Sequence, residues 1–324
     1  QSNNSISLND KLGPTMTISS STVNSGESSN DSTISLTFTS SESTTNFIES
    51  DITISGGSLS SFSGSGTTYT ATLTQSGDAT YTISVAQNKF TDSFGNNNSA
   101  SNTFSWTYDS TAPTITGVTL ASDNTTITVT FSEAVYNTNS GSGSLEVGDF
   151  VFALSGGNAT LSSTTPSSIS INGNEYTLGI SLSGTPNGSE TLTVNPVSSS
   201  IYDLAGNVAS TSQSNNSISL NDKLGPTMTI SSSTVNSGET SNDSTISLTF
   251  TSSESTTNFI ESDITISGGS LSSFSGSGTT YTATLTPSGD ATYTINVAQN
   301  KFTDSAGNNN SASNTFSWTY DSTA

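Results

Sequence analysis

Nine carboxylates, arranged in three sets of three, are the residues of this chain best suited to bind a ligand. Each set combines an aspartate from a proline-containing joint, a glutamate that follows an expected strand and an aspartate from an expected loop. The sets are Asp10, Glu42 and Asp92; Asp109, Glu133 and Asp203; and Asp222, Glu254 and Asp304. Hard oxygen ligands supplied by loops suit Ca²⁺. The sets therefore predict structural calcium sites, and the alternative is a solvated acidic surface in which each aspartate caps its own turn.

Most catalytic chemistry is excluded by composition. The 324 residues include no His, Cys or Arg, so a Ser-His-Asp triad, a cysteine nucleophile and the usual zinc sites are absent. Glu49 and Asp51 form a close carboxylate pair of the kind that glycosidases use. The pair recurs at Glu261 and Asp263, and a duplicated active site on a repeat is not expected. We expect no enzymatic activity.

Net charge limits the partners. The chain carries 25 acidic residues and a formal charge of −21, which repels nucleic acid and anionic lipid. Its apolar runs are only a few residues long, far below the length of a membrane span. We expect no nucleic-acid partner and no membrane insertion.

A long repeat organises the chain. Residues 1–112 and 213–324 have nearly the same sequence at an offset of 212. They differ only at positions 28/240, 75/287, 84/296 and 94/306. A different stretch lies between them, so the order is A–B–A′. An active site is needed once per protein, whereas length and valency grow with copy number. The repeat favours an extended array.

The elements that must position the carboxylates are predicted to be strands. In A, apolar residues alternate with Ser and Thr at Met16-Ile18, Ile34-Leu36-Phe38, Ile52-Ile54, Tyr69-Ala71-Leu73, Tyr81-Ile83-Val85 and Phe104-Trp106-Tyr108. One apolar and one hydroxyl face per strand is typical of a two-sheet sandwich. We expect about seven strands per unit, separated by glycine turns that include Gly64-Ser65-Gly66. Trp106 and Trp318 are interpreted as core residues.

Proline-containing phrases mark the joints. They are Lys11-Leu12-Gly13-Pro14, Ser110-Thr111-Ala112-Pro113 and Lys223-Leu224-Gly225-Pro226. The predicted domains are A at 11–109, B at 110–222 and A′ at 223–324. Residues 1–10 match 213–222 and are predicted to be the last strand of a preceding B-type domain. In a seven-stranded immunoglobulin-like sandwich, the loops after the second strand and before the last lie where the chain enters, which would bring each carboxylate set together.

Loop and joint motifs carry a family resemblance. Phe131-Ser132-Glu133-Ala134-Val135, Asp203-Leu204-Ala205-Gly206-Asn207 and Asp304-Ser305-Ala306-Gly307-Asn308 resemble the bacterial immunoglobulin-like repeats of giant surface adhesins, including those of a cyanobacterial surface protein needed for swimming. The resemblance implies tandem all-β sandwiches in an extracellular rod, with calcium at or near the joints. Phe94 departs from the motif, which has a small residue there.

We therefore predict a structural segment of a long fibre or adhesin stalk at the cell surface. Its expected partners are further copies of the same repeats in cis and, in a filament, neighbouring chains; the sequence does not identify a distal ligand. The alternative is a carbohydrate-binding module in B, which carries a long loop at 137–148 and a distinctive segment around Pro166.

Overall fold

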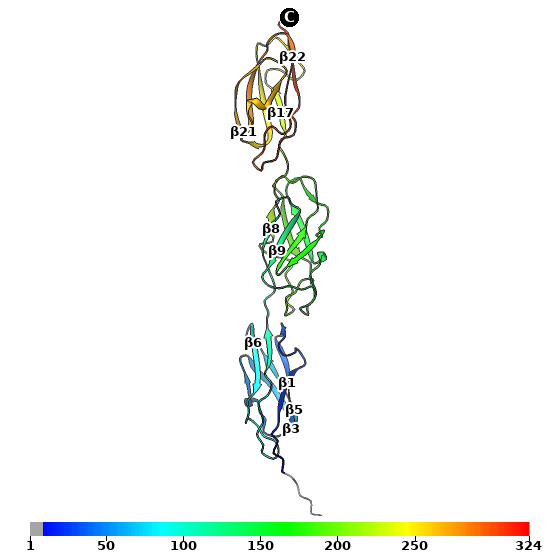
Figure 1. The fold of residues 1–324 in the computed structure, drawn as a ribbon, viewed down its shortest axis with the longest axis vertical. Coiled ribbons are helices and arrows are strands. Elements are labelled where there is room, and N and C mark those ends of the chain that lie inside the picture. The colour runs from blue at the N-terminus through cyan, green and yellow to red at the C-terminus, as the bar shows by residue number, and fades with distance from the viewer. Residues whose placement is uncertain (1–8, 324) are drawn as a thin grey trace, which may run out of the picture.

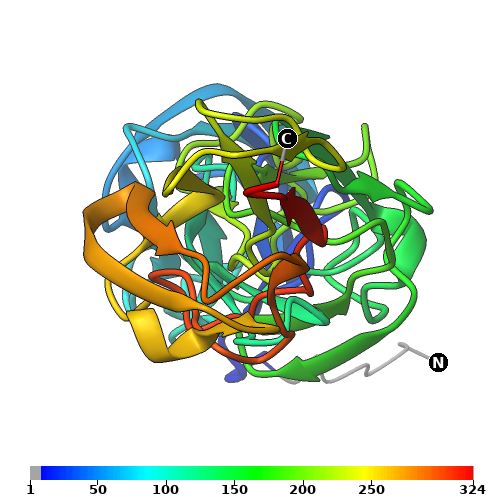
Figure 2. The same cartoon turned by 90° about the horizontal axis from the view of Figure 1, so that it is seen from above.

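Three β-sandwiches follow one another along the chain. The computed structural model describes residues 9–323, and Figure 1 shows the sandwiches end to end in a single row. Seen from above, along the long axis of the molecule, the three sandwiches lie one behind another (Figure 2). The helices of the described residues are three single 3₁₀ turns, and none is long and apolar enough to cross a membrane. The prediction of tandem all-β sandwiches is confirmed.

Domain A consists of two facing sheets. One has the strand order β1-β3-β5 and the other the order β2-β7-β6-β4, in which β2 runs parallel to β7. The elements are β1 (Met16–Ser20), β2 (Ser28–Ser29), β3 (Thr33–Thr44), η1 (Glu49–Asp51), β4 (Ile52–Ile54), β5 (Ser58–Thr74), β6 (Ala79–Val85) and β7 (Phe104–Tyr108). Domain A′ repeats this plan with β17 (Met228–Ser232), β18 (Thr240–Ser241), β19 (Ile246–Thr256), η3 (Glu261–Asp263), β20 (Ile264–Ile266), β21 (Ser270–Thr286), β22 (Ala291–Val297) and β23 (Phe316–Tyr320).

Domain B forms its sandwich from shorter strands. A sheet with the order β12-β13-β9-β8 faces a sheet with the order β10-β15-β16, and β11 pairs with β14. The elements are β8 (Ile115–Leu120), β9 (Thr126–Phe131), η2 (Val147–Asp149), β10 (Phe150–Ser155), β11 (Thr160–Leu161), β12 (Ile169–Asn172), β13 (Glu175–Gly179), β14 (Leu182–Ser183), β15 (Thr191–Pro196) and β16 (Ser217–Ser219).

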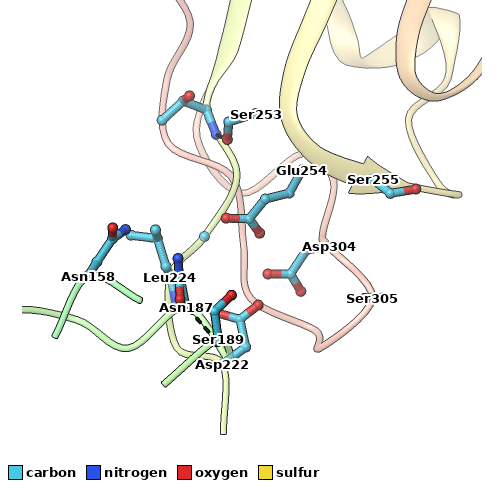
Figure 3. Close-up of a pocket in the computed structure, with 12 residues that line it drawn as sticks. Asn158, Asn187, Ser189, Asp222, Leu224, Ser253, Glu254, Ser255, Asp304 and Ser305 are labelled. Atoms are coloured by element: carbon cyan, nitrogen blue, oxygen red, sulfur yellow. Dashed lines mark hydrogen bonds between the residues drawn. The ribbon is translucent and has the colours of Figure 1, made fainter. Parts of the chain in front are cut away.

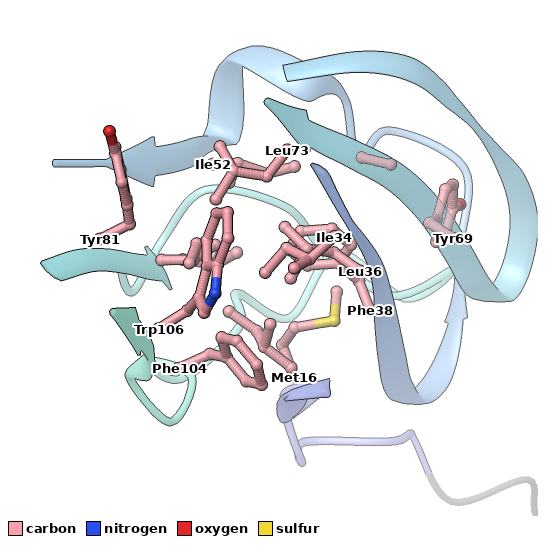
Figure 4. Packing of buried hydrophobic residues seen from close by; sticks show 14 of the residues in the cluster. Met16, Ile34, Leu36, Phe38, Ile52, Tyr69, Leu73, Tyr81, Phe104 and Trp106 are labelled. Carbon is pink, nitrogen blue, oxygen red and sulfur yellow. The ribbon is translucent and has the colours of Figure 1, made fainter. Parts of the chain in front are cut away.

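Each sandwich encloses its own apolar core, built from the alternate residues of its strands. In A, Phe38 lies opposite Tyr69, and Tyr81 lies opposite Trp106. Trp106 is fully buried in the core between the two sheets (Figure 4), and its indole N–H donates to Ser29 Oγ at 3.0 Å. Trp106 and Trp318 are therefore core residues, as predicted. Burying one large apolar side chain stabilises a fold by about 1.5–3 kcal/mol.

One predicted turn is wrong. Gly64-Ser65-Gly66 does not reverse the chain but lies inside β5, a strand of 17 residues. Gly64 and Gly66 have φ of +136° and +67°, and the pairing of β5 with β3 shifts register between Thr39 and Thr44. Because glycine adopts these angles without steric cost, the strand bends and continues. The last strand of a preceding domain, predicted at residues 1–10, falls mostly on residues 1–8, which lie outside the described residues.

Candidate metal centres

The structure brings together all three predicted carboxylate sets. In each set, one carboxylate oxygen from every residue lies within 4.8 Å of the other two. Figure 3 shows Asp222, Glu254 and Asp304 pointing toward one another at the joint between B and A′. In every set, the glutamate and the joint aspartate are half-buried and the loop aspartate is buried. We call the end of a domain that carries such a cluster its entry pole.

Strand ends place the glutamate next to the loop aspartate. In A, Glu42 lies near the end of β3, and a β-bridge joins Thr44 to Asp92. In B, the corresponding bridge joins Tyr136 to Tyr202, the neighbour of Asp203. In these two domains, the bridges hold two segments that are far apart in the sequence at a fixed separation, so both clusters belong to the fold and not to one flexible loop.

An asparagine four positions after the loop aspartate holds that carboxylate in place. Asn207 donates its backbone N–H to Asp203 Oδ1 at 2.8 Å and its side-chain amide to Asp203 Oδ2 at 2.7 Å. A buried carboxylate needs such donors, because burial without them is costly. Sequence reasoning did not assign these asparagines a role, although the repeated Asp-x-x-Gly-Asn pattern was the signal. The equivalent pairs are Asp92 with Asn96 and Asp304 with Asn308.

The joint aspartate is fixed by its own turn and by the domain that follows. Asp222 Oδ1 accepts the backbone N–H of Leu224 at 2.9 Å. The chain then passes so close to the loop before the last strand that a Cβ on Gly225 would lie 2.1 Å from Asn309 O. Pro226 O accepts the N–H of Ser311 at 3.0 Å. The joint segment is therefore part of the entry pole of A′ and does not hang free.

Burial and the two neighbouring aspartates raise the pKa of the glutamate in each cluster. Burial, together with the charges of Asp222 and Asp304, raises the pKa of Glu254 above 4.5, and Glu42 and Glu133 shift in the same direction for the same causes. Burial also raises the pKa of Asp304, but hydrogen bonds from Asn308 and from neighbouring backbone N–H groups outweigh it and hold the pKa below 3.8. Each cluster thus holds more negative charge than its surroundings neutralise.

The metal-free protein should accordingly be most stable in mildly acidic solution. The raised pKa of Glu254 contributes stability that is present below 4.5 and is lost as the pH rises through the raised value. The lowered pKa of Asp304 has the opposite effect. It contributes stability to the fold that is present above pH 3.8 and is lost as the pH falls through the lowered pKa. In EDTA, we expect the melting temperature to rise as the pH falls from neutrality toward the raised pKa of Glu254. Calorimetry of wild type and Glu254→Gln checks this, and an equally steep rise in the variant would contradict it.

The structure also places the carboxylate pair of η1 and the long loop of domain B, the two other candidates from the sequence. Asp51 accepts the backbone N–H of Ile48 at 3.0 Å and so caps η1. In the long loop at 137–148, a Cβ on Gly141 would lie 2.9 Å from Leu204 O, and Asn139 and Ser140 border the cleft between A and B. Asn139 and Ser140 of this loop therefore lie at the A–B joint.

A match to a known domain family supports the sandwich assignment for A and A′. Residues 10–108 and 222–320 match the family described as bacterial Ig-like domain. FdeC, described as a broadly conserved Escherichia coli adhesin, has a TM-score of 0.38 at 14% identity, over 95% of this chain and 98% of that one. InvD of Yersinia pseudotuberculosis has a TM-score of 0.37 at 15% identity, over 95% and 98%.

A third solved structure, invasin, is described as a bacterial integrin-binding protein and has a TM-score of 0.32 at 16% identity, over 88% of this chain and 56% of that one. All three scores lie below 0.5, so nothing about this chain follows from them. No curated protein matches the sequence.

Proposed function

Because this chain belongs to the bacterial Ig-like domain family, we propose that it is a structural segment of a long extracellular fibre or adhesin stalk in which Ca²⁺ stiffens the domain joints. The observation that carries the proposal is the recurrence of one cluster, of the same three residue types, at the entry pole of every sandwich. A spacer repeats the same structural element in every domain, whereas a binding or catalytic site is needed once.

The donor set fits a calcium ion. Ca²⁺ binds oxygen ligands at about 2.3–2.6 Å, so two ligands on opposite sides of one ion lie about 5 Å apart. The carboxylate oxygens of each cluster lie within 4.8 Å of one another, and the clusters contain no nitrogen or sulfur donor that would favour zinc. Asp222, Glu254 and Asp304 would hold the ion at the B–A′ joint, where its charge would offset their repulsion.

We expect the chain to be a rod in solution. Strands rise about 3.3 Å per residue, and three sandwiches in a row should span on the order of 110–140 Å. Small-angle X-ray scattering in millimolar Ca²⁺ should give a maximum dimension in that range. A compact envelope, with a maximum dimension below about 80 Å, would contradict the spacer role. This limit is well below the length of the expected rod.

Calcium binding itself is tested by calorimetric titration of the chelated chain, with Mg²⁺ as the comparison ion. We expect saturable binding at millimolar Ca²⁺ or below, with a stoichiometry approaching one ion per cluster. Lack of binding at millimolar Ca²⁺ would leave the clusters as solvated acidic poles and would remove calcium from the proposal, whereas the spacer role is tested by the scattering measurement.

A further inference from the structure

The two joints of the chain are built differently. At the A–B joint, the body of domain A bonds directly to B: the Asn30 backbone N–H donates to Ala205 O at 3.1 Å, and the Asn30 side-chain amide donates to Asn207 Oδ1 at 3.2 Å. Within residues 9–323, no hydrogen bond connects the bodies of B (113–221) and A′ (226–320). There the joint segment alone bonds to B, through Lys223 N–H and Pro186 O at 2.9 Å.

The loop of B that receives Asn30 is held rigidly in its bonded form. Besides bonding to Asp203, the Asn207 amide donates to Asp109 O at 2.9 Å, so its Oδ1 is the one polar atom of the side chain left to accept from Asn30. Ala205 is buried, and Gly206 has a φ of +93°, where a Cβ would lie 2.9 Å from Asn139 O. Asn30 thus meets a surface whose acceptors are already in place.

Domain A also holds the joint segment on its own side. The Asp78 carboxylate accepts the N–H and Oγ–H of Ser110 at 3.0 and 2.8 Å and the hydroxyl of Thr111 at 2.8 Å. The chain therefore leaves A in a fixed direction. A cleft beside this segment is lined by residues of both domains, namely Thr22, Val23, Gly26–Asp31, Asn139, Ser140, Leu204 and Ala205.

We propose that the C-terminal end of an A-type domain, its exit pole, is a docking surface for the Leu204–Asn207 loop of a B-type domain, and that Asn30 is the residue that binds this loop. The exit pole of A comprises residues 22–31 and Asp78. The same surface recurs in A′ at 234–243 and Asp290, where only Thr240 replaces Ser28, and Ser322 N–H again bonds to the aspartate at 2.9 Å. A B-type domain is the occupant, because that is the domain bound to the corresponding surface of A in this molecule.

The docking contact needs no metal ion, because its donors are amides and its acceptors are a carbonyl and an amide oxygen. The direct contact of Asn30 with B therefore persists when cations are removed, so the A–B joint should loosen less on chelation than the B–A′ joint. This holds whether or not the carboxylate clusters bind calcium, so the test below is independent of the proposed function.

The experiment is a pair of spin-label distance measurements on the full chain. The sequence contains no cysteine, so labels at exposed Thr17 and Thr119 report on the A–B joint alone, and labels at Thr119 and Thr229 report on the B–A′ joint alone. In EDTA, we expect a narrow A–B distance distribution in the wild type and one at least about twofold broader in Asn30→Ala, since two joined domains move freely when the contacts between them are few.

Asn242→Ala is the matched control, because Asn242 occupies the same position in the A′ repeat and, within residues 9–323, no B-type loop lies beside it. It should leave both distributions unchanged. Unchanged width in Asn30→Ala, with and without Ca²⁺, would overturn the proposal. Since Asn30 is exposed and its side chain contacts only Asn207 by hydrogen bond, the variant should fold normally, which tryptophan fluorescence verifies.

Hydrogen exchange of the backbone amides in the wild-type chain is a second test of the proposal. The Asn30 N–H is bonded to Ala205 O and should exchange at least about tenfold more slowly than the Asn242 N–H, because exchange requires the bond to open. Equal exchange of the two amides would show that the exit pole of A is not docked and would also overturn the proposal.

Discussion

Chelation of Ca²⁺ should loosen the B–A′ joint and lower the melting temperature of the chain. The oxygens of Asp222, Glu254 and Asp304 lie within 4.8 Å of one another. At that separation, and with an effective dielectric constant of about 20, each pair of charges repels by roughly 3 kcal/mol before screening. Removing an ion between them leaves this repulsion beside a joint that, within residues 9–323, has no direct hydrogen bond between the bodies of B and A′.

The domains themselves should remain folded after chelation, because their cores lie away from the clusters. For a domain of this size, each kcal/mol lost lowers the melting temperature by about 4–8 °C. Scanning calorimetry measures this loss, and scattering measures the shortening of the mean end-to-end distance. Asp203→Asn should reproduce part of the thermal effect for the cluster of domain B.

Glu175→Gln is the control for these measurements, since it removes the same charge from an exposed position on β13, outside the clusters. A melting temperature and a scattering curve that both stay unchanged by chelation would show that the clusters do not bind a stabilising ion. An equal change of the melting temperature in Asp203→Asn and Glu175→Gln would show that the stability depends only on net charge and not on the cluster.

Replacement of Glu190 by alanine should destabilise domain B more than any change of a surface residue. Glu190 is fully buried, and its Oε1 accepts the backbone N–H groups of Asn158 at 2.7 Å, Ala159 at 2.9 Å and Asn187 at 3.2 Å. Burial raises its pKa, but these hydrogen bonds outweigh burial and hold the pKa below 4.5. The carboxylate therefore remains charged at neutral pH and ties two loops at the C-terminal end of B to each other.

Glu190→Ala leaves three backbone donors without their acceptor, and each such loss costs about 1–3 kcal/mol. We expect a loss of at least about 3 kcal/mol in the free energy of unfolding of B. Calorimetry is the suitable measurement, because both tryptophans lie in A and A′ and fluorescence would not follow B. Glu175→Ala is the matched control, and a loss below about 1 kcal/mol in Glu190→Ala would contradict the assigned role.

Glu190→Ala should also make the B–A′ joint more mobile. The loops that Glu190 holds carry Asn158, Asn187 and Ser189, which border the cleft at the B–A′ joint together with Leu224. Leu12, the equivalent of Leu224 in A, is 74% exposed, whereas Leu224 is half-buried. Labels at Thr119 and Thr229 should therefore report a broader distance distribution in the variant, while the A–B distribution stays unchanged.

The sequence by itself determined the strands and the three clusters. Alternation such as Ile34-Leu36-Phe38 specifies a strand locally, because successive side chains point to opposite faces and only one face is apolar. The carboxylate sets were also predictable, since the loops that lie together at one end of a sandwich follow from strand order alone. The turn predicted at Gly64–Gly66 failed because a glycine permits a bend within a strand as readily as a reversal, and pairing with β3 decides between them.

Only the tertiary structure decided what holds the joints. Glu190 looks like an ordinary surface glutamate in the sequence, and it becomes a buried acceptor because loops 157–159 and 187–190 meet around it. Asn30 and its copy Asn242 occupy equivalent positions in repeats that differ nearby only at Ser28/Thr240, yet within residues 9–323 only Asn30 has a B-type loop within bonding distance. A hydrogen bond across a domain boundary depends on how two separately folded surfaces meet, and no local pattern of residues records that position.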